Sequence, residues 1–502
     1  MTRRHAPLAM DSQTFRTLGR QLVDQVAALL EAVPGGAVTR DASPSAVRDA
    51  LGLDGPLPES GTDPGPLLEQ TAQLLFDHSL FNGHPRFFGY VTASPAPIGM
   101  LADLLAAAVN PNVGAWTLSP AATEIEAQTV RWIAELIGYP PACGGLLTSG
   151  GNMANVICFM AARAAAADWD VRALGVNGGA GRRLRVYGST ETHTWLQKAA
   201  DMAGLGTESI RWIPTDRQHR MDVGALGRQI EADVAAGDVP CLVVGTAGSV
   251  STGAVDPLPE IAALCKAHGV WLHVDGAYGG FAAAVPETPD DLRALSLADS
   301  VAVDPHKWLY APLEAGCALV RDPERLRAAF AYHPPYYHFD EHATNYLDSG
   351  PQNSRGFKAL KVWLALRQVG AAGYRTMIAD DIRLSRLMAE TVGSHPDLQL
   401  TSQALSITTF RFVPEDLRAG LGSEPVEREL DALNRALLDR LQRDGETFVS
   451  NAVIDGRYVL RACIVNFHTE RADVEALPEI VVRRGRALRA AAQHGAETLV
   501  PA

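Results

Sequence analysis

The sequence predicts an α/β protein whose large domain contains a mostly parallel sheet. One observation is a series of short runs rich in β-branched residues that alternate with helical stretches between about residues 144 and 322. A second is that five of these runs are followed at once by small or polar residues, as at the ligand-binding edge of an open sheet. The seven predicted strands cover residues 145–148, 184–187, 210–213, 241–245, 271–274, 300–303 and 317–320.

The length and composition fit a folded chain of two or three domains. The protein has 502 residues, of which 47% are hydrophobic and 20% are charged. We divide it into an N-terminal helical segment at 1–97, a large domain at 98–377 and a small α+β C-terminal domain at 378–502.

The N-terminal segment is predicted to be helical and to depend on other parts of the protein for its stability. Apolar residues recur at helical spacing over 13–33, and a Gly- and Pro-rich connector at 55–66 leads to a second helix at 67–76. Because so short a segment forms little core of its own, we expect its apolar faces to pack on the rest of the chain or on a second subunit.

Beyond the sheet, residues 332–354 show neither helical nor strand periodicity and are rich in Tyr, His and Asp. Loops of this length are typical of lids or binding loops. A helix is predicted at 357–369, followed from about residue 378 by a helix, strands at 407–413, 447–453 and 458–465 that enclose a helix at 426–443, and a final helix.

Charge and cysteine content exclude several classes of partner. The net charge of −13 argues against binding to nucleic acid or to an anionic membrane. We find no apolar run long enough for a signal-peptide core or a membrane span, and we expect a cytoplasmic protein. The six cysteines are scattered without a CxxC pair, so we predict neither a metal site nor a disulfide framework.

Lysine chemistry gives the first indication of an active site. Only five lysines stand among the 44 Lys and Arg residues, and Lys307 directly follows a predicted strand, between His306 and Trp308. A lysine at a strand exit is often only a solvated charge. Beside an aromatic residue, however, its amine can be partly desolvated and can act as a nucleophile.

Three further features lie at the same predicted sheet edge. Asp275 ends the strand WLHVD, where a carboxylate is a helix cap, a metal ligand or a partner for a protonated pyridine nitrogen. The run TSGGN at 148–152 opens a helix after a strand and offers free N–H groups to a phosphate. His193 either begins a helix or lies flat on a cofactor ring. Together with Lys307, these features match the needs of pyridoxal 5'-phosphate (PLP).

The order TSGGN, TETH, HVDGAYGG and DPHKWL resembles the PLP-dependent group II amino-acid decarboxylases, which include aromatic-L-amino-acid and glutamate decarboxylases. HPRFFGY at 84–90, SPAATEIE at 119–126 and RGFKALKVW at 355–363 extend the resemblance over most of the chain. The resemblance implies the fold type I of PLP enzymes and a homodimer with a shared active site.

The resemblance also implies roles for individual residues. Lys307 would form the Schiff base with PLP, Asp275 would keep the pyridine nitrogen protonated, and His193 would stack on the ring. Thr246 would contact the phenolic oxygen. The remaining predicted cofactor contacts are Gly150, Gly151 and Asn152 at the phosphate, with Ala277, Asp304 and His306. Asp304 stands where relatives often carry Asn, which leaves its own role open.

Residues of the substrate site are implied in the same way. Tyr346 stands where aromatic-amino-acid decarboxylases carry a mobile-loop tyrosine that protonates the quinonoid carbon, although Tyr332, Tyr336 and Tyr337 share its loop. A pocket built by Tyr90, Val91, Thr92 and Trp116 is apolar and aromatic, with no evident extra cation, and therefore favours decarboxylation of an aromatic L-amino acid.

The sequence also allows other substrates and other reactions. HPRFF also occurs in relatives with acidic substrates, and SPAAT is similar to diaminobutyrate decarboxylases, so glutamate, cysteine sulfinate or diaminobutyrate are alternative substrates. An aldehyde synthase or an aminotransferase on the same scaffold is a second alternative, and a non-catalytic regulator is a third.

Overall fold

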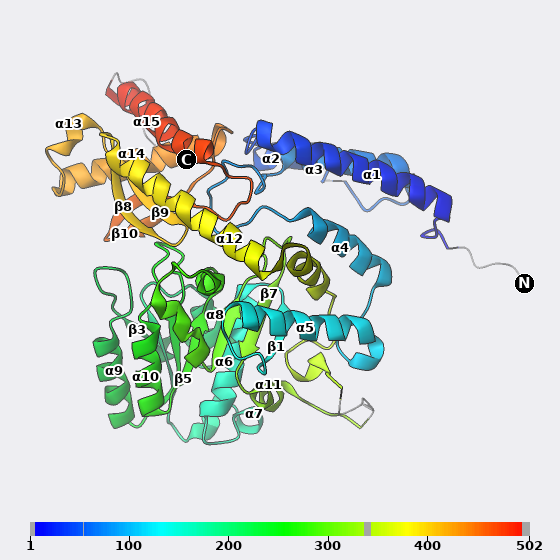
Figure 1. Cartoon of the computed structure of the whole chain (residues 1–502), viewed down its shortest axis with the longest axis vertical. Helices are drawn as coiled ribbons and strands as arrows, with labels where there is room; N and C mark the ends of the chain where they lie inside the picture. The colour runs from blue at the N-terminus through cyan, green and yellow to red at the C-terminus, as the bar shows by residue number, and fades with distance from the viewer. Residues whose placement is uncertain (1–5, 54, 336–342, 494–502) are drawn as a thin grey trace, which may run out of the picture.

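The computed structural model describes residues 6–53, 55–335 and 343–493. Figure 1 shows a sheet-based large domain, a C-terminal domain beside it and an arm of N-terminal helices that projects from the body. The arm consists of α1 (Ser12–Ala32), α2 (Pro44–Leu51) and α3 (Pro64–His78). The Asp11 side chain caps α1 by accepting N–H groups of its first turn. The two predicted N-terminal helices are therefore present.

The large domain is built on a seven-stranded sheet in the order β1-β7-β6-β5-β4-β2-β3. All seven predicted strands are confirmed, with bounds β1 (Gly144–Thr148), β2 (Leu184–Ser189), β3 (Ile210–Ile213), β4 (Val239–Thr246), β5 (Trp271–Asp275), β6 (Ser300–Val303) and β7 (Gly316–Val320). Only β7 runs against its neighbours β1 and β6. The carboxyl ends of β1, β2, β4, β5 and β6 therefore share one edge, and each of the five predicted polar loops begins there.

Helices cover both faces of this sheet, which explains why its strands are almost wholly apolar. Fully buried side chains such as Val274 and Val301 fill its core. The helices are α4 (Pro97–Val109), α5 (Pro120–Leu136), α6 (Gly151–Ala166), α7 (Val171–Leu174), α8 (Trp195–Met202), α9 (Val223–Ala235), α10 (Leu258–His268) and α11 (Pro323–Phe330). Short 3-10 helices lie at Val33–Gly35, Trp116–Leu118, Val176–Gly179, Thr207–Ser209, Gly279–Ala284, Asp290–Leu297 and Tyr346–Asp348.

A long helical segment, α12 (Ala359–Ser394), joins the large domain to the C-terminal domain (Figure 1). This segment consists of two helices that meet at a kink, in agreement with the helices predicted on either side of residue 370. Only Gly370 departs from helical geometry, with a φ of +68°, a backbone angle that glycine adopts without steric cost. The boundary that we placed between residues 377 and 378 falls within α12.

The C-terminal domain packs helices against an antiparallel sheet in the order β10-β11-β9-β8. Its elements are β8 (Leu398–Ala404), β9 (Ile407–Phe412), α13 (Glu415–Arg418), α14 (Glu424–Arg443), β10 (Ser450–Ile454), β11 (Arg457–Cys463) and α15 (Arg471–Gln493). The sequence did not predict β8. Phe88, which belongs to the HPRFFGY run of the N-terminal segment, is buried in the core of the C-terminal domain. This contact packs the N-terminal segment against the C-terminal domain.

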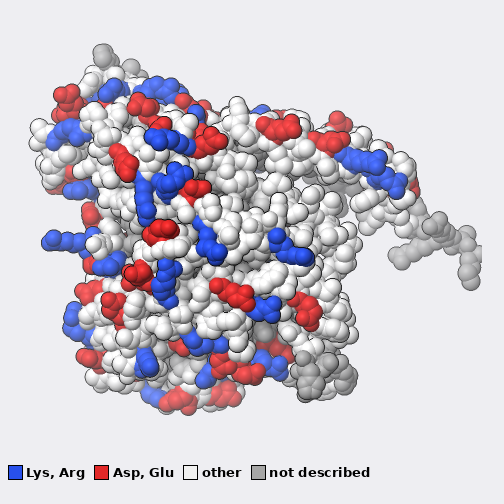
Figure 2. All heavy atoms as spheres, in the orientation of Figure 1, with Lys and Arg blue, Asp and Glu red and all other residues white. Residues whose placement is uncertain are grey.

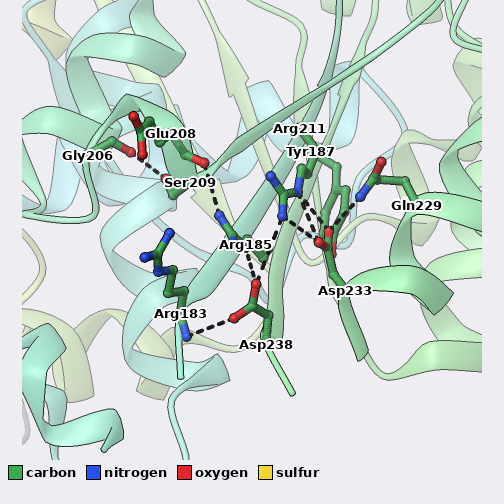
Figure 3. Close-up of polar contacts among 10 residues, drawn as sticks. All are labelled: Arg183, Arg185, Tyr187, Gly206, Glu208, Ser209, Arg211, Gln229, Asp233 and Asp238. Atoms are coloured by element: carbon green, nitrogen blue, oxygen red, sulfur yellow. Dashed lines mark hydrogen bonds and ion pairs between the residues drawn. The ribbon is translucent and has the colours of Figure 1, made fainter. Parts of the chain in front are cut away.

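A cluster of charged side chains, of which Arg185 and Asp233 are buried, links β2, β3 and neighbouring segments at one end of the large sheet. Figure 3 shows Arg185 beside Asp238, and Arg211 between Asp233 and Asp238, and the Tyr187 hydroxyl donates to Asp233 at 3.0 Å. Backbone and side-chain donors use all four carboxylate oxygens. None of these residues lines the cavity described below, so we assign the cluster a structural role.

Over the described residues, no helix combines the length and the apolar character that crossing a bilayer requires. Figure 2 shows Lys and Arg side chains mixed with Asp and Glu over the visible face, without a broad area of one sign. All six cysteines are free thiols.

Candidate active site

A cavity of about 580 Å³ lies at the shared carboxyl edge of the sheet and reaches β10 and β11 of the C-terminal domain. It brings together most of the residues that the sequence singled out, which are Tyr90, Val91, Thr92, Gly150, Gly151, Asn152, His193, Thr246, Asp275, Ala277, Asp304, His306 and Lys307. Trp116 and Tyr346 do not line it. The topology of the sheet explains most of this convergence, because all of these residues except Tyr90, Val91 and Thr92 lie at or just after the carboxyl end of a strand.

A larger cavity of about 770 Å³ lies at the opposite edge, where β5 and β6 begin. Its polar wall includes Asp299 and Arg321, but these side chains already bond to backbone groups. No buried side-chain N or O atom of its lining residues lacks a hydrogen-bond partner. The candidate catalytic and cofactor-binding side chains therefore lie in the smaller cavity.

The first wall of the smaller cavity is a backbone cradle suited to a phosphate. Gly150 has a φ of +103° and precedes α6 without a side-chain cap, so the first N–H groups of the helix face the cavity edge without a capping side chain. A Cβ atom on Gly151 would lie 2.7 Å from Asp304 Oδ2, and one on Gly150 would lie 3.2 Å from His306 Cε1. Only glycine therefore fits this close approach of loop and strand exit.

The second wall is the turn that carries Lys307. Its Nζ atom lies 3.0 Å from Asp304 Oδ2, and His306 Nε2 lies 3.6 Å from the same oxygen. Asp304 Oδ1 is buried and has no hydrogen-bond partner in the described part of the chain. Burial lowers the pKa of His306, which favours its neutral ring. The carboxylate of Asp304 is thus the ionic partner of the lysine amine.

The third wall carries Asp275 and His193. Asp275 Oδ2 accepts the indole N–H of Trp195 at 2.7 Å, and Oδ1 accepts the backbone N–H of Ala277 at 3.1 Å. His193 Nδ1 accepts the backbone N–H of Trp195 at 3.3 Å. Burial lowers the pKa of His193, so its ring is neutral near pH 7 and suited to lie against a flat cofactor.

A buried arginine on β11 completes the cavity, and the sequence analysis did not anticipate it. Arg461 is only 3% exposed, and its Nη1 atom donates to the Tyr90 carbonyl at 3.0 Å and to Ser450 Oγ at 3.1 Å. Its Nε and Nη2 atoms have no partner among the described residues. The expectation that the pocket lacks an extra cation was therefore wrong. The only local signal was a single charge inside the otherwise apolar run YVLRAC.

Tyr346 and Trp116 lie together in another part of the same chain. The Tyr346 ring is buried 4.6 Å below the Arg355 guanidinium, and the Trp116 backbone N–H donates to Asn345. Burial raises the pKa of Tyr346 well above its ordinary value. Of the alternative loop tyrosines, Tyr336 and Tyr337 lie outside the described residues.

The residues of the cavity fit PLP. The buried Thr246 hydroxyl has no partner among the described residues and is free to bond a ring oxygen, and the glycine cradle can bind a phosphate. Lys307 supplies an amine for a carbonyl carbon, and Asp275 supplies an anchored carboxylate for a pyridine nitrogen. No group of three or more His, Cys, Asp and Glu residues is placed to hold a metal in the described regions. These features fit an enzyme that binds a phosphorylated aldehyde cofactor through a lysine.

Comparison with known proteins agrees with this chemistry. Residues 51–412 match the pyridoxal-dependent decarboxylase conserved domain, and the chain belongs to this family. It is 31% identical to an aromatic-L-amino-acid decarboxylase of Bacillus atrophaeus, over 95% of this chain and 96% of that protein. It is 28% identical to a phenylacetaldehyde synthase of Arabidopsis thaliana, over 94% of this chain and 96% of that protein.

Among solved structures, that of Oryza sativa TDC with PLP and tryptamine matches with a TM-score of 0.88 and 27% identity, over 97% of this chain and all of that one. The predicted family, fold class and cofactor are thereby confirmed. The protein is a PLP-dependent decarboxylase, a carboxy-lyase.

Proposed function

We propose that this decarboxylase converts an aromatic L-amino acid to the corresponding amine and carbon dioxide. The observation that carries the proposal is the pairing of an apolar wall at Tyr90, Val91 and Leu313 with the unpaired guanidinium atoms of Arg461 in one cavity. The apolar wall suits an aromatic side chain, and Arg461 suits the α-carboxylate of the substrate. The similarity to aromatic-amino-acid decarboxylases supports the same substrate class.

The residues of the cavity divide the work of the reaction. PLP, when bound, accepts the electron pair released when the bond between Cα and the carboxylate breaks. Lys307 would supply the amine that attaches the cofactor, and Asp275 would hold a proton on its ring nitrogen. His193 would lie against the ring as a neutral imidazole, and Arg461 would orient the carboxylate that leaves.

Charge on the cavity wall separates the alternative substrates. Glu191 and Glu314 both line the cavity, and Glu191 Oε2 is buried without a partner in the described part of the chain. Glu314 is half exposed and already pairs with Lys358 at 3.6 Å, so Glu191 is the carboxylate that disfavours an acidic side chain such as that of glutamate or cysteine sulfinate. Glu191 would tolerate the cationic side chain of diaminobutyrate, which is therefore the second candidate substrate.

We also propose a homodimer with shared active sites. α1 has an apolar stripe but no buried residue, and on α4 Leu101, Leu104, Leu105 and Val109 are all more than half exposed. The surface around α4 carries few charges in Figure 2. Because Trp116 and Tyr346 do not line the cavity of their own chain, their predicted roles would require the segment that holds them to face the cavity of a second copy. The six free thiols support a reducing location, which we propose to be the cytoplasm.

A substrate screen of the purified holoenzyme tests the proposal. We expect the wild type to release amine and carbon dioxide from one or more aromatic L-amino acids. Lys307→Ala should release neither product, and the visible absorption of the lysine-bound cofactor should be absent from this variant. Amine from diaminobutyrate alone would select the second candidate. Aldehyde with peroxide would indicate an aldehyde synthase, and a keto acid would indicate an aminotransferase. An enzyme that bound no PLP would refute all of these assignments.

A further inference from the structure

Trp195 touches two residues of the proposed cofactor site without lining the cavity itself. It is the first residue of α8, and its side chain is completely buried. The indole Nε1 donates to Asp275 Oδ2 at 2.7 Å, and the backbone N–H of the same residue donates to His193 Nδ1. One residue thus contacts both the carboxylate and the imidazole that face the cofactor position.

The indole is held rigidly in this arrangement. It meets the ring of His273 edge to face, with centroids 5.7 Å apart and an interplanar angle of 87°. His273 is itself fixed by Asn155 Oδ1 at 2.7 Å and Ser300 Oγ at 2.9 Å. Since Trp195 packs among fully buried residues of the sheet and α6, its N–H cannot turn away from Asp275.

The bond to Asp275 has a clear electrostatic consequence. A hydrogen bond donated to a carboxylate stabilises the anionic form, and its effect is strong in a site shielded from water. With Oδ2 bound by the indole and Oδ1 bound by the Ala277 N–H, the carboxylate cannot rotate. A lone pair of the anion then stays directed at a partner in the cavity.

We propose that Trp195 is a positioning residue that holds the Asp275 carboxylate aimed at the pyridine nitrogen of PLP, and so maintains the electron-withdrawing power of the cofactor. The backbone N–H of Trp195 has a separate effect, because it makes His193 Nδ1 an acceptor and places the proton of the neutral ring on Nε2. The inference rests on the proposed pairing of Asp275 with the ring nitrogen, and it holds for any amino-acid substrate.

The direct test follows the protonation of the ring nitrogen by NMR. Holoenzyme is reconstituted with PLP labelled with ¹⁵N in the ring, whose shift separates protonated from unprotonated nitrogen. Two variants remove the indole N–H: Trp195→Phe, and replacement of Trp195 by benzothienylalanine, which keeps the bicyclic shape. Trp169→Phe is the matched control, because it loses an indole hydrogen bond to the Gly175 carbonyl and does not line the cavity.

We expect the ring nitrogen to be protonated in the wild type and in Trp169→Phe. Loss of one hydrogen bond to a charged group should shift the protonation equilibrium by about tenfold to a hundredfold in the two Trp195 variants. The kcat should fall by about tenfold or more, with KM changed much less. The benzothienyl variant keeps the packing, so it separates the loss of the N–H from misfolding.

Two results would overturn the inference. If Asp275→Asn removes the protonated signal but both Trp195 variants keep it, Asp275 acts at the nitrogen without help from Trp195. If the wild-type nitrogen is unprotonated, the pairing of Asp275 with the ring fails, and the role of Trp195 fails with it. The substrate screen is independent of both results, so the proposed reaction is judged separately.

Discussion

Asp381 on α12 is a buried carboxylate beneath the turn that carries Lys307, and its ionisation is expected to weaken the fold as pH rises. Its Oδ2 atom accepts the indole N–H of Trp308 at 3.0 Å and the hydroxyl of Tyr310 at 2.7 Å. Burial raises the pKa of Asp381 to about 7, and the hydrogen bonds offset that effect only in part. The variant Asp381→Asn keeps the size of the side chain and removes its titration.

The sign follows from the protons bound in each state. In the unfolded chain Asp381 ionises with the ordinary pKa of 3.8, so between pH 4 and 7 the folded protein holds the extra proton. The contribution of Asp381 to stability is therefore fully present below pH 4 and is lost as pH rises toward 7. The difference between the two pKa values corresponds to about 4 kcal/mol in the free energy of unfolding.

Urea denaturation of the holoenzyme, followed by circular dichroism at fixed protein and cofactor concentrations, measures this effect. Between pH 5 and 8 the wild type should lose a few kcal/mol more than Asp381→Asn, and the two curves should converge toward acid pH. Parallel curves, with a difference that stays constant within about 1 kcal/mol, would show that the carboxylate is ionised in the folded protein throughout and would refute the reasoning.

Two further variants test the cavity itself. Gly151→Ala places a methyl group 2.7 Å from Asp304 Oδ2, so the affinity for PLP, measured by absorbance titration, should fall at least ~10-fold. In the control Gly356→Ala the added methyl group meets no atom within 4 Å, and this variant should bind PLP normally. Equal affinities of the two variants would show that the glycine cradle does not bind the cofactor. Arg461→Met should reduce kcat/KM by about tenfold to a hundredfold with PLP binding unchanged, because a charge-assisted bond to the substrate carboxylate is lost. The matched control is Arg457→Met on the exposed end of the same strand, and an unaltered kcat/KM in Arg461→Met would exclude the proposed contact.

The parts of the fold that could be predicted are those whose pattern is local. Strands β1 to β7 are short apolar runs because both faces of the sheet are covered, and each run ends in a polar loop. By contrast, LQLTSQA of β8 lies at a sheet edge with only Leu398 buried, so its residues resemble a loop. The division of the helical region near residue 370 is also local, because Gly370 leaves helical geometry and two helices meet there at a kink.

The same distinction separates the site residues. Those at strand exits, such as Asp275 and Lys307, could be found because the topology of a parallel sheet gathers strand ends. Arg461, Asp381 and Trp195 could not, since their importance arises from contacts with residues far away in the sequence. A tryptophan after TETH has no visible function until Asp275 is seen to accept its N–H.

This division also explains why the reaction is easier to predict than the substrate. The proposed cofactor contacts, from the glycine cradle to Lys307, all come from loops at one sheet edge of one chain. The substrate side combines Tyr90 from the N-terminal segment, Arg461 from the C-terminal domain and, in the proposed homodimer, the segment of Trp116 and Tyr346 from a second subunit. Residues that bind the cofactor lie at one rigid sheet edge and therefore form short contiguous motifs in the sequence. Residues that select the substrate come from three separate parts, so no short motif contains them together.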